Sequence, residues 1–479
     1  MNHRTPLLRL AVPNYVALLS GVLTGIVDVA WVARLGPSPV AAVAVATGVE
    51  NALLGIVLLI SGGVTVRLAA ALGAGDTHTG RDRPGGATAG GATAGGEAGA
   101  LAVIRAGWRL YLVITPVVVL AGTALRGTLA GAFLADPGAA RLAGAYLAVL
   151  FPGVAIFYAQ QVVDAIFAGR GDTRTPMRLA LTANALILVL DPLLIYGAGL
   201  GVTGAALATA AGRAVALTGG LVRLHRGRPG GRLRPDAALP VRAVARTGAP
   251  IAGDFLVRMA GALVLLAVVG RHGVAAVAAY GIGLKVLYFA TMGFYAIRNA
   301  ATIHTPRTLS ARPGQRAAIG RQVLTLALVA GIGASALFAG FAPLIMRLFT
   351  ADRAVAAAGV LFLRCVGGYL VPIAAVIGLA GFLMAAGRGA RLFAVTVAGT
   401  ALQTLLALWL PARLGLPGVW LAMALAAVFQ LLLVLASANL RDHPAAAAEG
   451  GGPVGTEAVK PAVSRSRRSA GDRPERAPR

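Results

Sequence analysis

The chain has 479 residues, of which 57% are hydrophobic and only 13% are charged, and it carries a formal net charge of +26. A soluble globular protein carries about 25% charged residues, so this composition excludes a soluble fold. The mean hydropathy of +0.78 argues against a nucleic-acid-binding protein, which needs a wetted basic face. The single cysteine, Cys365, excludes an internal disulfide framework. Basic charge on so apolar a chain indicates the loops of a membrane protein.

Twelve apolar runs reach the length of about 20 residues that a membrane-spanning helix needs. The first run is followed by RLGPSP with no small-residue cleavage site, so it is interpreted as a retained helix and not as a signal peptide. The sequence therefore predicts an all-α membrane protein with twelve transmembrane helices. In chain order the runs are 8–32, 39–64, 107–133, 144–168, 177–197, 201–223, 246–270, 274–299, 320–347, 354–385, 389–411 and 416–438.

Three polar segments separate or follow these runs. Residues 73–99 contain GGATAGGATAGGEAG and are predicted to form a flexible loop. Residues 224–245 are basic and rich in Pro and Gly, and they are predicted to be a cytoplasmic linker between an N-lobe (1–223) and a C-lobe (246–438). Residues 439–479 are predicted to be a disordered basic tail, either solvated without a role or tethered to anionic lipid.

The distribution of basic residues predicts the orientation. If both termini lie in the cytoplasm, the cytoplasmic segments and the cytoplasmic ends of the helices hold 32 of the 43 Lys and Arg residues. The outer ends of the helices hold seven, and four lie within the predicted spans. Cytoplasmic loops of membrane proteins carry such an excess of Lys and Arg. We therefore expect cytoplasmic termini in a multi-pass protein of the bacterial inner membrane.

The two halves of the chain resemble each other. Four segments of the first half align with segments of the second half: AVPNYVALL with GAPIAGDFL, FLADPGAARLAGAYL with LFTADRAVAAAGVLFL, AGRGDTRTP with AGRGARLF, and GLGVTGAALA with GLPGVWLAMA. The second of these alignments places Asp136 opposite Asp352. The pairs keep the same order at offsets of about 214 to 237 residues. Because both halves start on the same side, the pattern predicts two six-helix lobes related by a pseudo-twofold axis along the membrane normal. Such symmetry favours a transporter that opens alternately to each side.

Two carboxylates inside spans are candidates for cation coupling. Asp28 lies in the first span and Asp191 in the fifth, and neither has a Lys or Arg at helical spacing. A carboxylate within a membrane span is costly and indicates function by default, although interhelical hydrogen bonds are the alternative explanation. Asn184 lies seven residues before Asp191, on the same helical face.

Other charges inside the spans are candidates for facing a central cleft. Glu50 lies in the second span, and its counterpart in the repeat is the neighbour of Lys285, so we expect Glu50 and Lys285 to approach each other in one state. Asp254 and Arg258 are four residues apart and are expected to neutralise each other. Arg213 is expected to extend toward a membrane interface.

Signatures of enzymes are missing from the sequence. GDTRTP lacks the glycine-rich stretch and the Lys-Ser/Thr ending of a phosphate-binding loop. No Ser/His/Asp order or His/Cys metal spacing is visible. We therefore expect neither an enzyme nor a resident metal or cofactor.

The chain resembles the multidrug and toxic compound extrusion (MATE) family over roughly residues 8–438. The resemblance rests on LAVPNYVALLSGVLTGIVDVAWVARLGPSPVAAVAVA, AAALGAGD, FAGRGDTRTPMRLALTANALILVLDPLLIYGAGLGVTGAALATA and LFTADRAV, and it is closest to the DinF-like branch. It implies two six-helix lobes around a central cleft, and antiport of an organic solute against protons or sodium.

The resemblance also implies a cation site in the N-lobe. Asp28, Asp191 and Thr209 match the positions that the DinF-like branch uses for this site. Where the family commonly has an Asn one turn before the second acid, this chain has Ile187, and Asn184 substitutes only in part. Because sodium needs several oxygen ligands, this departure favours protons over sodium as the coupling ion.

In the C-lobe the resemblance points to a lost cation site. Another branch carries a Glu eight residues after the proline of the seventh helix, and counting from Pro250 gives Arg258. The expected function is therefore export of cationic or amphipathic organic solutes by a monomer in the lipid bilayer, coupled in the N-lobe and without a nucleic-acid partner. Arg258 and Lys285 leave zwitterionic or anionic solutes open. The alternatives are a lipid-linked oligosaccharide flippase of the same superfamily and a non-transporting membrane scaffold.

Overall fold

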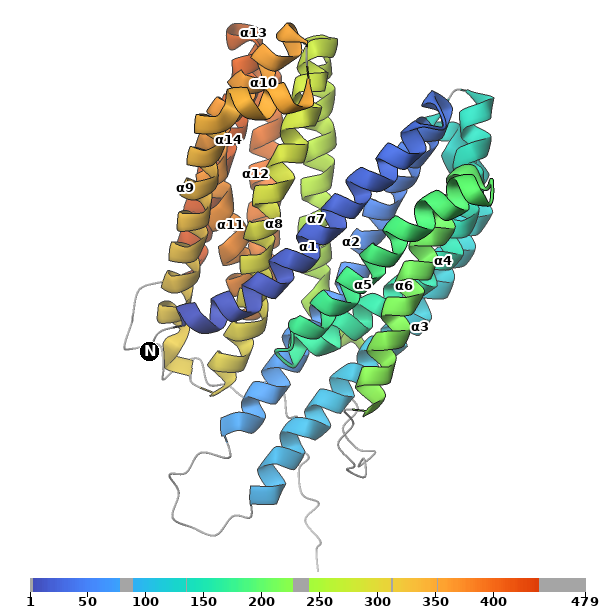
Figure 1. The fold of residues 1–479 in the computed structure, drawn as a ribbon. Coiled ribbons are helices and arrows are strands. Elements are labelled where there is room, and N and C mark those ends of the chain that lie inside the picture. Colours follow the sequence, from blue (N-terminus) through green and yellow to red (C-terminus); the bar gives the residue numbers. More distant parts are fainter. Residues whose placement is uncertain are drawn as a thin grey trace, which may run out of the picture. The chain divides into compact units, whose positions relative to one another are not determined.

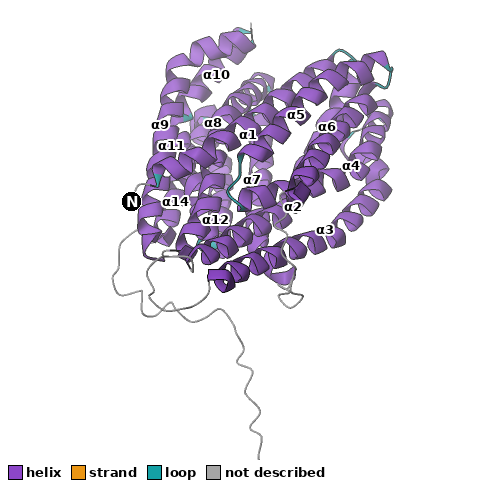
Figure 2. Cartoon of the chain, turned by 60° about the horizontal axis from the view of Figure 1, so that its bottom comes forward, coloured by secondary structure: helices purple, strands orange, loops and turns teal. Residues whose placement is uncertain are grey.

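The computed structural model describes residues 3–77, 89–134, 136–226, 241–311, 313–350 and 352–438. Within these ranges the chain is helical and the helices are joined by short turns (Figures 1 and 2). The helices are α1 (Arg4–Ala33), α2 (Pro37–Thr77), α3 (Ala89–Phe133), α4 (Pro137–Gly169), α5 (Arg174–Pro192), the π-helix η1 (Leu193–Gly197), α6 (Gly201–Arg226), α7 (Val241–Gly270), α8 (Val274–Ala311), the 3-10 helix η2 (Pro313–Gln315), α9 (Arg316–Phe349), α10 (Arg353–Cys365), α11 (Gly367–Ala385), α12 (Gly389–Trp409), α13 (Pro411–Leu414) and α14 (Leu416–Ala438).

Twelve helices in the described ranges are long and apolar enough to cross a membrane, which confirms the predicted number of spans. Hydropathy located the apolar centres of the helices but missed the polar extensions of several of them, such as α2, α3 and α8. The predicted loop 73–99 is wrong at both ends, because α2 continues to Thr77 and α3 already begins at Ala89. The predicted linker is likewise shorter, since α6 ends at Arg226 and α7 begins at Val241. Residues 78–88, 227–240 and the tail from 439 lie outside the described residues.

One predicted span is divided in the structure. The apolar run 354–385 forms α10 and α11, which meet at Val366, and only α11 has membrane-span length. Its counterpart in the first half, α4, is one continuous helix. Two glycines, Gly367 and Gly368, follow the break, and glycine is a poor helix former.

The internal repeat has structural counterparts at the helix starts. Asp136 precedes α4 and accepts hydrogen bonds from the backbone N–H groups of Ala139, at 2.8 Å, and Gly138, at 3.3 Å. These bonds hold the pKa of Asp136 below its usual value. Asp352 precedes α10 and accepts in the same way from the N–H of Ala354 at 2.8 Å. Both aspartates therefore cap helix N-termini, where a carboxylate oxygen satisfies otherwise unpaired donors.

The turns of the two halves also correspond. Gly171 and Gly387, from the paired AGRG motifs, both have a positive φ, of 82° and 77°, which glycine adopts without a steric penalty. Near the start of α6, a Cβ at Gly204 would overlap the backbone of Leu194, and a Cβ at Gly418 in α14 would overlap the backbone of Leu410. The same close packing is therefore built twice in the chain.

The helices α1–α6 and α7–α14, named the N-lobe and the C-lobe from here on, each form a bundle. In the N-lobe α4 packs against α2, α3 and α6, and α5 packs against α1 and α6. In the C-lobe α11 packs against α8, α9 and α14, and most of its residues are buried. Helix α1 also packs against α8, and α2 packs against α7 and α8, so these helices join the lobes (Figure 1).

Small residues let α2 and α7 approach closely. A Cβ at Gly248 would overlap the carbonyl of Leu59, and a Cβ at Gly63 would overlap the carbonyl of Val244. Such residues are typical of membrane helix interfaces, where backbone proximity replaces the hydrophobic driving force. Both contacts involve the first half of α7, which begins at Val241. The two lobes therefore contact each other near the end of the molecule at which the N-terminus lies.

We expect Gly248→Ala to destabilise the protein by about 1–3 kcal/mol, because its methyl group has no space against α2. The matched control is Gly270→Ala on the same helix, where a Cβ meets nothing within 4 Å. Replacing a helical glycine by alanine without strain is favourable by roughly 0.5–1 kcal/mol, so the control should melt at or above the parent temperature. Thermal unfolding in one detergent measures both, and equal melting temperatures would contradict the close crossing.

Candidate functional site

Asp191 lies at the end of α5, at a break in regular helix geometry. Its successor, Pro192, has no N–H to donate, and the π-helix η1 begins one residue later. Single-turn π-helices occur frequently at functional sites. The Asp191 side chain is fully buried, and among the described residues neither of its oxygens has a hydrogen-bond partner. A buried charge without a partner is unstable, so this carboxylate requires a proton or a cation.

Asp28 on α1 is the carboxylate whose charge acts on Asp191. Its Oδ1 is also buried without a hydrogen-bond partner among the described residues. Asp28 and Asp191 interact electrostatically, and two negative charges at short range repel each other. The structure therefore brings together the two acids singled out in the sequence, in a setting that a positive charge would stabilise.

Glu50 is paired with a residue that the sequence did not suggest. In the structure Glu50 on α2 forms an ion pair with Arg213 on α6, and not with Lys285. The Arg213 guanidinium also lies over the ring of Phe157, 4.3 Å from its centroid. The expectation that Arg213 extends to a membrane interface is therefore wrong. Its nearest anion comes from another helix, and spacing along one helix cannot reveal such a partner.

Tyr146 on α4 is a member of this site that sequence reasoning missed. Its side chain is 5% exposed, and it interacts electrostatically with Glu50, Asp28, Arg213 and Asp191. A tyrosine in an apolar run carries no signal of its own, because most aromatic residues in such runs only pack. The contacts of α4 with α2 and α6 bring it beside the charged groups.

The other two predicted members of the cation site have different surroundings. Asn184 donates a hydrogen bond from Nδ2 to Oγ of Ser20 at 2.8 Å, which joins α5 to α1. Thr209 is partly buried on α6, and no hydrogen bond joins it to Asp28 or Asp191 in the described part of the chain. Ile187 is buried against Gly212 of α6 and supplies no oxygen. The polar groups nearest to the acids are thus fewer than the sequence suggested.

In the C-lobe Asp254 is the centre of a larger cluster than the predicted pair. Its carboxylate is fully buried and accepts a hydrogen bond from Thr396 Oγ1 at 2.6 Å and from Arg258 Nε at 3.2 Å. Its second oxygen lies 3.3 Å from Nη2 of Arg298 on α8. Mutual neutralisation of Asp254 and Arg258 is therefore only part of the arrangement, since two guanidinium groups share one carboxylate.

Arg298 belongs to this cluster, although no pattern in the sequence indicates it. Position 298 falls at the cytoplasmic end of the predicted span 274–299, so the predicted orientation places Arg298 among the cytoplasmic charges. The helix α8 continues to Ala311, and the Arg298 side chain is only 7% exposed. A window of apolar residues cannot locate this boundary, because the polar continuation of α8 is buried by other helices.

Lys285, on the same helix, contrasts with Arg298. It is exposed, and in the described ranges no carboxylate lies within ion-pair distance of it. An unpaired ammonium group is costly in the hydrocarbon of a membrane, so we expect Lys285 to face a water-filled cavity or the membrane interface.

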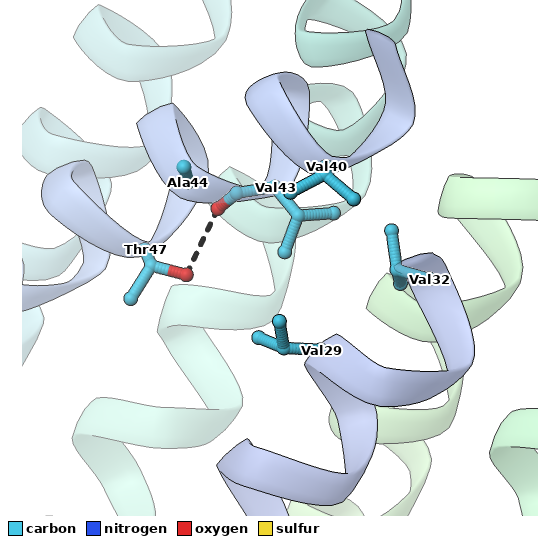
Figure 3. Close-up of a pocket in the computed structure, with 6 residues that line it drawn as sticks. All are labelled: Val29, Val32, Val40, Val43, Ala44 and Thr47. Atoms are coloured by element: carbon cyan, nitrogen blue, oxygen red, sulfur yellow. Dashed lines mark hydrogen bonds between the residues drawn. The ribbon is translucent and has the colours of Figure 1, made fainter. Parts of the chain in front are cut away.

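A small hollow between α1 and α2 is a poor candidate for the site. Figure 3 shows that its lining is aliphatic apart from one hydroxyl, which donates to the carbonyl of Val43 at 2.9 Å. It is lined by Val29, Val32, Val40, Val43, Ala44 and Thr47. Without a charged or unsatisfied polar group, it has nothing with which to select a cation. Across the described residues there is also no group of three or more His, Cys, Asp or Glu that could hold a metal ion.

Twelve membrane-length helices, a repeated six-helix plan and buried ionisable groups in both halves define a multi-pass membrane protein of the transporter class. A family model described as MatE matches residues 13–81, 91–193 and 250–409. The chain therefore belongs to the MatE family of membrane transporters, which are not enzymes. This confirms the family resemblance seen in the sequence, though not a particular branch.

Known proteins resemble the chain over most of its length. The probable multidrug resistance protein NorM of Thermotoga maritima is 27% identical over 362 residues, which is 73% of this chain and 73% of that protein. A structure described as an outward-facing conformation of a multidrug resistance MATE family transporter of the MOP superfamily has a TM-score of 0.82, with 21% identity, covering 92% and 96% of the two chains. A MOP superfamily transporter from Pyrococcus furiosus, described as having a binding pocket of reversed polarity that suggests a different function, has a TM-score of 0.81, with 22% identity, covering 92% and 97%.

We expect Asp254→Asn to destabilise the protein by about 3–5 kcal/mol, because the buried Arg298 and the partly buried Arg258 would lose their shared anion. The matched comparison is Glu50→Gln, which removes the anion from a pair whose side chains are 22% and 24% exposed. For that pair we expect less than about 1 kcal/mol. Unfolding temperatures measured in one detergent test the difference, and similar shifts for both variants would contradict the role of Asp254.

Proposed function

We propose that this protein is a secondary active antiporter that exports organic solutes in exchange for a cation taken up by Asp28 and Asp191. The observation that carries the proposal is the fully buried carboxylate of Asp191, which has no hydrogen-bond partner among the described residues and repels its neighbour Asp28. Membership of the MatE family and the similarity to a probable multidrug resistance protein support efflux as the direction of transport.

Helix α1 supplies a path from cation binding to movement of the lobes. Asp28 lies on α1, which packs against α5 within the N-lobe and against α8 of the C-lobe. Near its start, α1 reaches the C-lobe through the Tyr15 hydroxyl, which donates to the carbonyl of Phe289 at 3.4 Å. A proton or cation on Asp28 and Asp191 removes their repulsion and lets α1 and α5 pack more closely. That shift of α1 changes its contacts with α8, and the solute is then released.

Protons are the preferred coupling ion. A sodium ion needs several oxygen ligands, and Ile187 offers none where the family commonly has an amide. The amide of Asn184 donates its hydrogen bond to Ser20 and not to a carboxylate. A proton needs only the carboxylate itself. The same acids and Thr209 favour the DinF-like branch, and we propose that the transporter works as a monomer.

The present conformation fits the proposed orientation. The lobes contact each other near the termini, where His3 Nδ1 lies 3.1 Å from His304 Nε2 and Arg67 Nε donates to Thr247 at 2.9 Å. The excess of basic residues at this end supports placing it in the cytoplasm. The molecule is then closed toward the cytoplasm, in keeping with its similarity to an outward-facing structure.

We expect Asp28→Asn and Asp191→Asn each to lower gradient-driven transport at least tenfold, because a neutral amide neither takes up a proton nor attracts a cation. Proteoliposomes under an imposed proton gradient, and separately under a sodium gradient, measure this with cationic, zwitterionic and anionic fluorescent compounds. The matched control is Asp136→Asn, since an Asn at this helix N-terminus still caps the helix.

Full transport by Asp28→Asn under the same gradient would overturn the proposed coupling site. Transport driven by sodium at constant pH, but not by protons, would overturn the preference for protons and leave the site in place. A parent protein that moves none of the compounds under either gradient would overturn the proposed function itself.

A further inference from the structure

Inside its helices the C-lobe carries more positive charge than the one carboxylate within those helices, that of Asp254, can balance. Asp254 is the one acidic residue within α7–α14 in the described residues, and its oxygens are already occupied by Thr396, Arg258 and Arg298. One guanidinium charge therefore remains without an anion of its own. Lys285 adds a second unbalanced charge on α8. Such an excess is expensive in the low dielectric of a membrane protein and calls for an anion from outside the chain.

Lys285 is exposed, Arg258 is the more exposed of the two arginines at 17% against 9% for Arg298, and Lys285 and Arg258 lie at a similar depth. Lys285 follows the start of α8 at Val274 by eleven residues, and Arg258 precedes the end of α7 at Gly270 by twelve. At 1.5 Å per residue both are about 17 Å from the turn that joins the two helices. Arg258 forms one ion pair through Nε and reaches Thr396 through Nη2 only at 3.4 Å, so its donors are not all engaged at close range.

A row of tyrosines on α8 leads from Lys285 to the arginines. Tyr288 and Tyr295 follow Lys285 at spacings of three and ten residues, which place the three side chains on one side of the helix. Tyr288 is 50% exposed, and the Arg298 guanidinium lies 5.6 Å from the ring centroid of Tyr295. Tyr295 also interacts electrostatically with Arg258. This face therefore offers both positive charge and aromatic surface, and its Lys285 and Tyr288 side chains are exposed.

The N-lobe has the opposite polarity. Asp28 and Asp191 have no basic partner among the described residues, while Glu50 is neutralised by Arg213. The N-lobe groups therefore sum to a negative charge and the C-lobe groups to a positive one. A solute held between the lobes meets anions on one side and cations on the other.

We infer that the solute carries both a cationic and an anionic group, with its carboxylate bound by Arg258 and Lys285 and its cationic part directed toward the N-lobe carboxylates. This rests on the proposed function, because it assumes a solute held between the lobes. An aromatic zwitterion matches all the features, since its ring stacks on the tyrosines of α8. A purely cationic solute is attracted by the N-lobe and repelled by the C-lobe.

Two dyes that differ in one group test the inference. Rhodamine 110 bears a carboxylate beside its cationic ring system, and rhodamine 123 is its methyl ester, which is purely cationic. Equilibrium binding to the full chain in lipid nanodiscs, followed by fluorescence anisotropy, should show tighter binding of rhodamine 110. Lys285→Gln and Arg258→Gln should each weaken rhodamine 110 about tenfold and strengthen rhodamine 123, because a repelling charge is removed.

Arg364→Gln is the matched control, because Arg364 is an exposed arginine of the C-lobe on α10, outside this face. It should change neither affinity. Lys285 is exposed, so its variant keeps the test decisive if Arg258→Gln fails to fold. Tighter binding of the ester than of the acid, equal losses for both dyes, or binding of neither dye would overturn the inference. Gradient-driven transport of rhodamine 123 alone would leave the proposed antiport standing and overturn only the zwitterionic solute.

Discussion

The arrangement of this protein depends on the free energy of placing charges inside a membrane. The C-lobe meets this constraint by enclosing Asp254 with a hydroxyl and two guanidinium groups: Oδ1 accepts hydrogen bonds from Thr396 and Arg258, and Oδ2 lies at ion-pair distance from Arg298. The N-lobe leaves Asp191 buried and without a partner among the described residues. A paired carboxylate fixes a structure, whereas an unpaired one must take a proton or a cation and so responds to its surroundings. The two halves of one repeat have therefore diverged in their electrostatics.

The repeat itself is conserved where backbone geometry requires it. Asp136 and Asp352 cap equivalent helices, and Gly171 and Gly387 adopt the same left-handed turn. The side chains that carry charge follow no such correspondence. Equal scaffolds with opposite interior charge support the proposals that the N-lobe takes up the cation and that the C-lobe binds an anionic group of the solute.

Contact between the lobes connects these two sites. Helix α1 carries Asp28 and packs against α8, and α8 carries Lys285 and Arg298. A change in charge at Asp28 therefore acts on a helix that packs against the C-lobe helix with these two cations. The close crossing of α2 and α7 at Gly63 and Gly248 keeps the lobes together near the termini during such a shift.

The number of spans, the repeat and the two N-lobe acids were predictable, because each depends on a pattern along the chain. Apolar length predicts a membrane helix, repeated motifs predict repeated structure, and a carboxylate in an apolar run stands out by itself. The helix extensions and the break at Val366 were not predictable, and neither were the ends of α2 and α3 around the predicted loop 73–99. Packing by other helices decides where a polar segment stays helical.

By itself, the sequence determined that this is a twelve-helix membrane protein with carboxylates at positions 28 and 191. Only the tertiary structure decided which charged side chains form ion pairs with each other. Arg213 pairs with Glu50 from another helix, Arg298 reaches Asp254 from α8, and Tyr146 lies beside the N-lobe acids. The physical reason is that ion pairs in a helical bundle form between helices, at distances set by packing, and spacing along one helix reports only the partners on that helix.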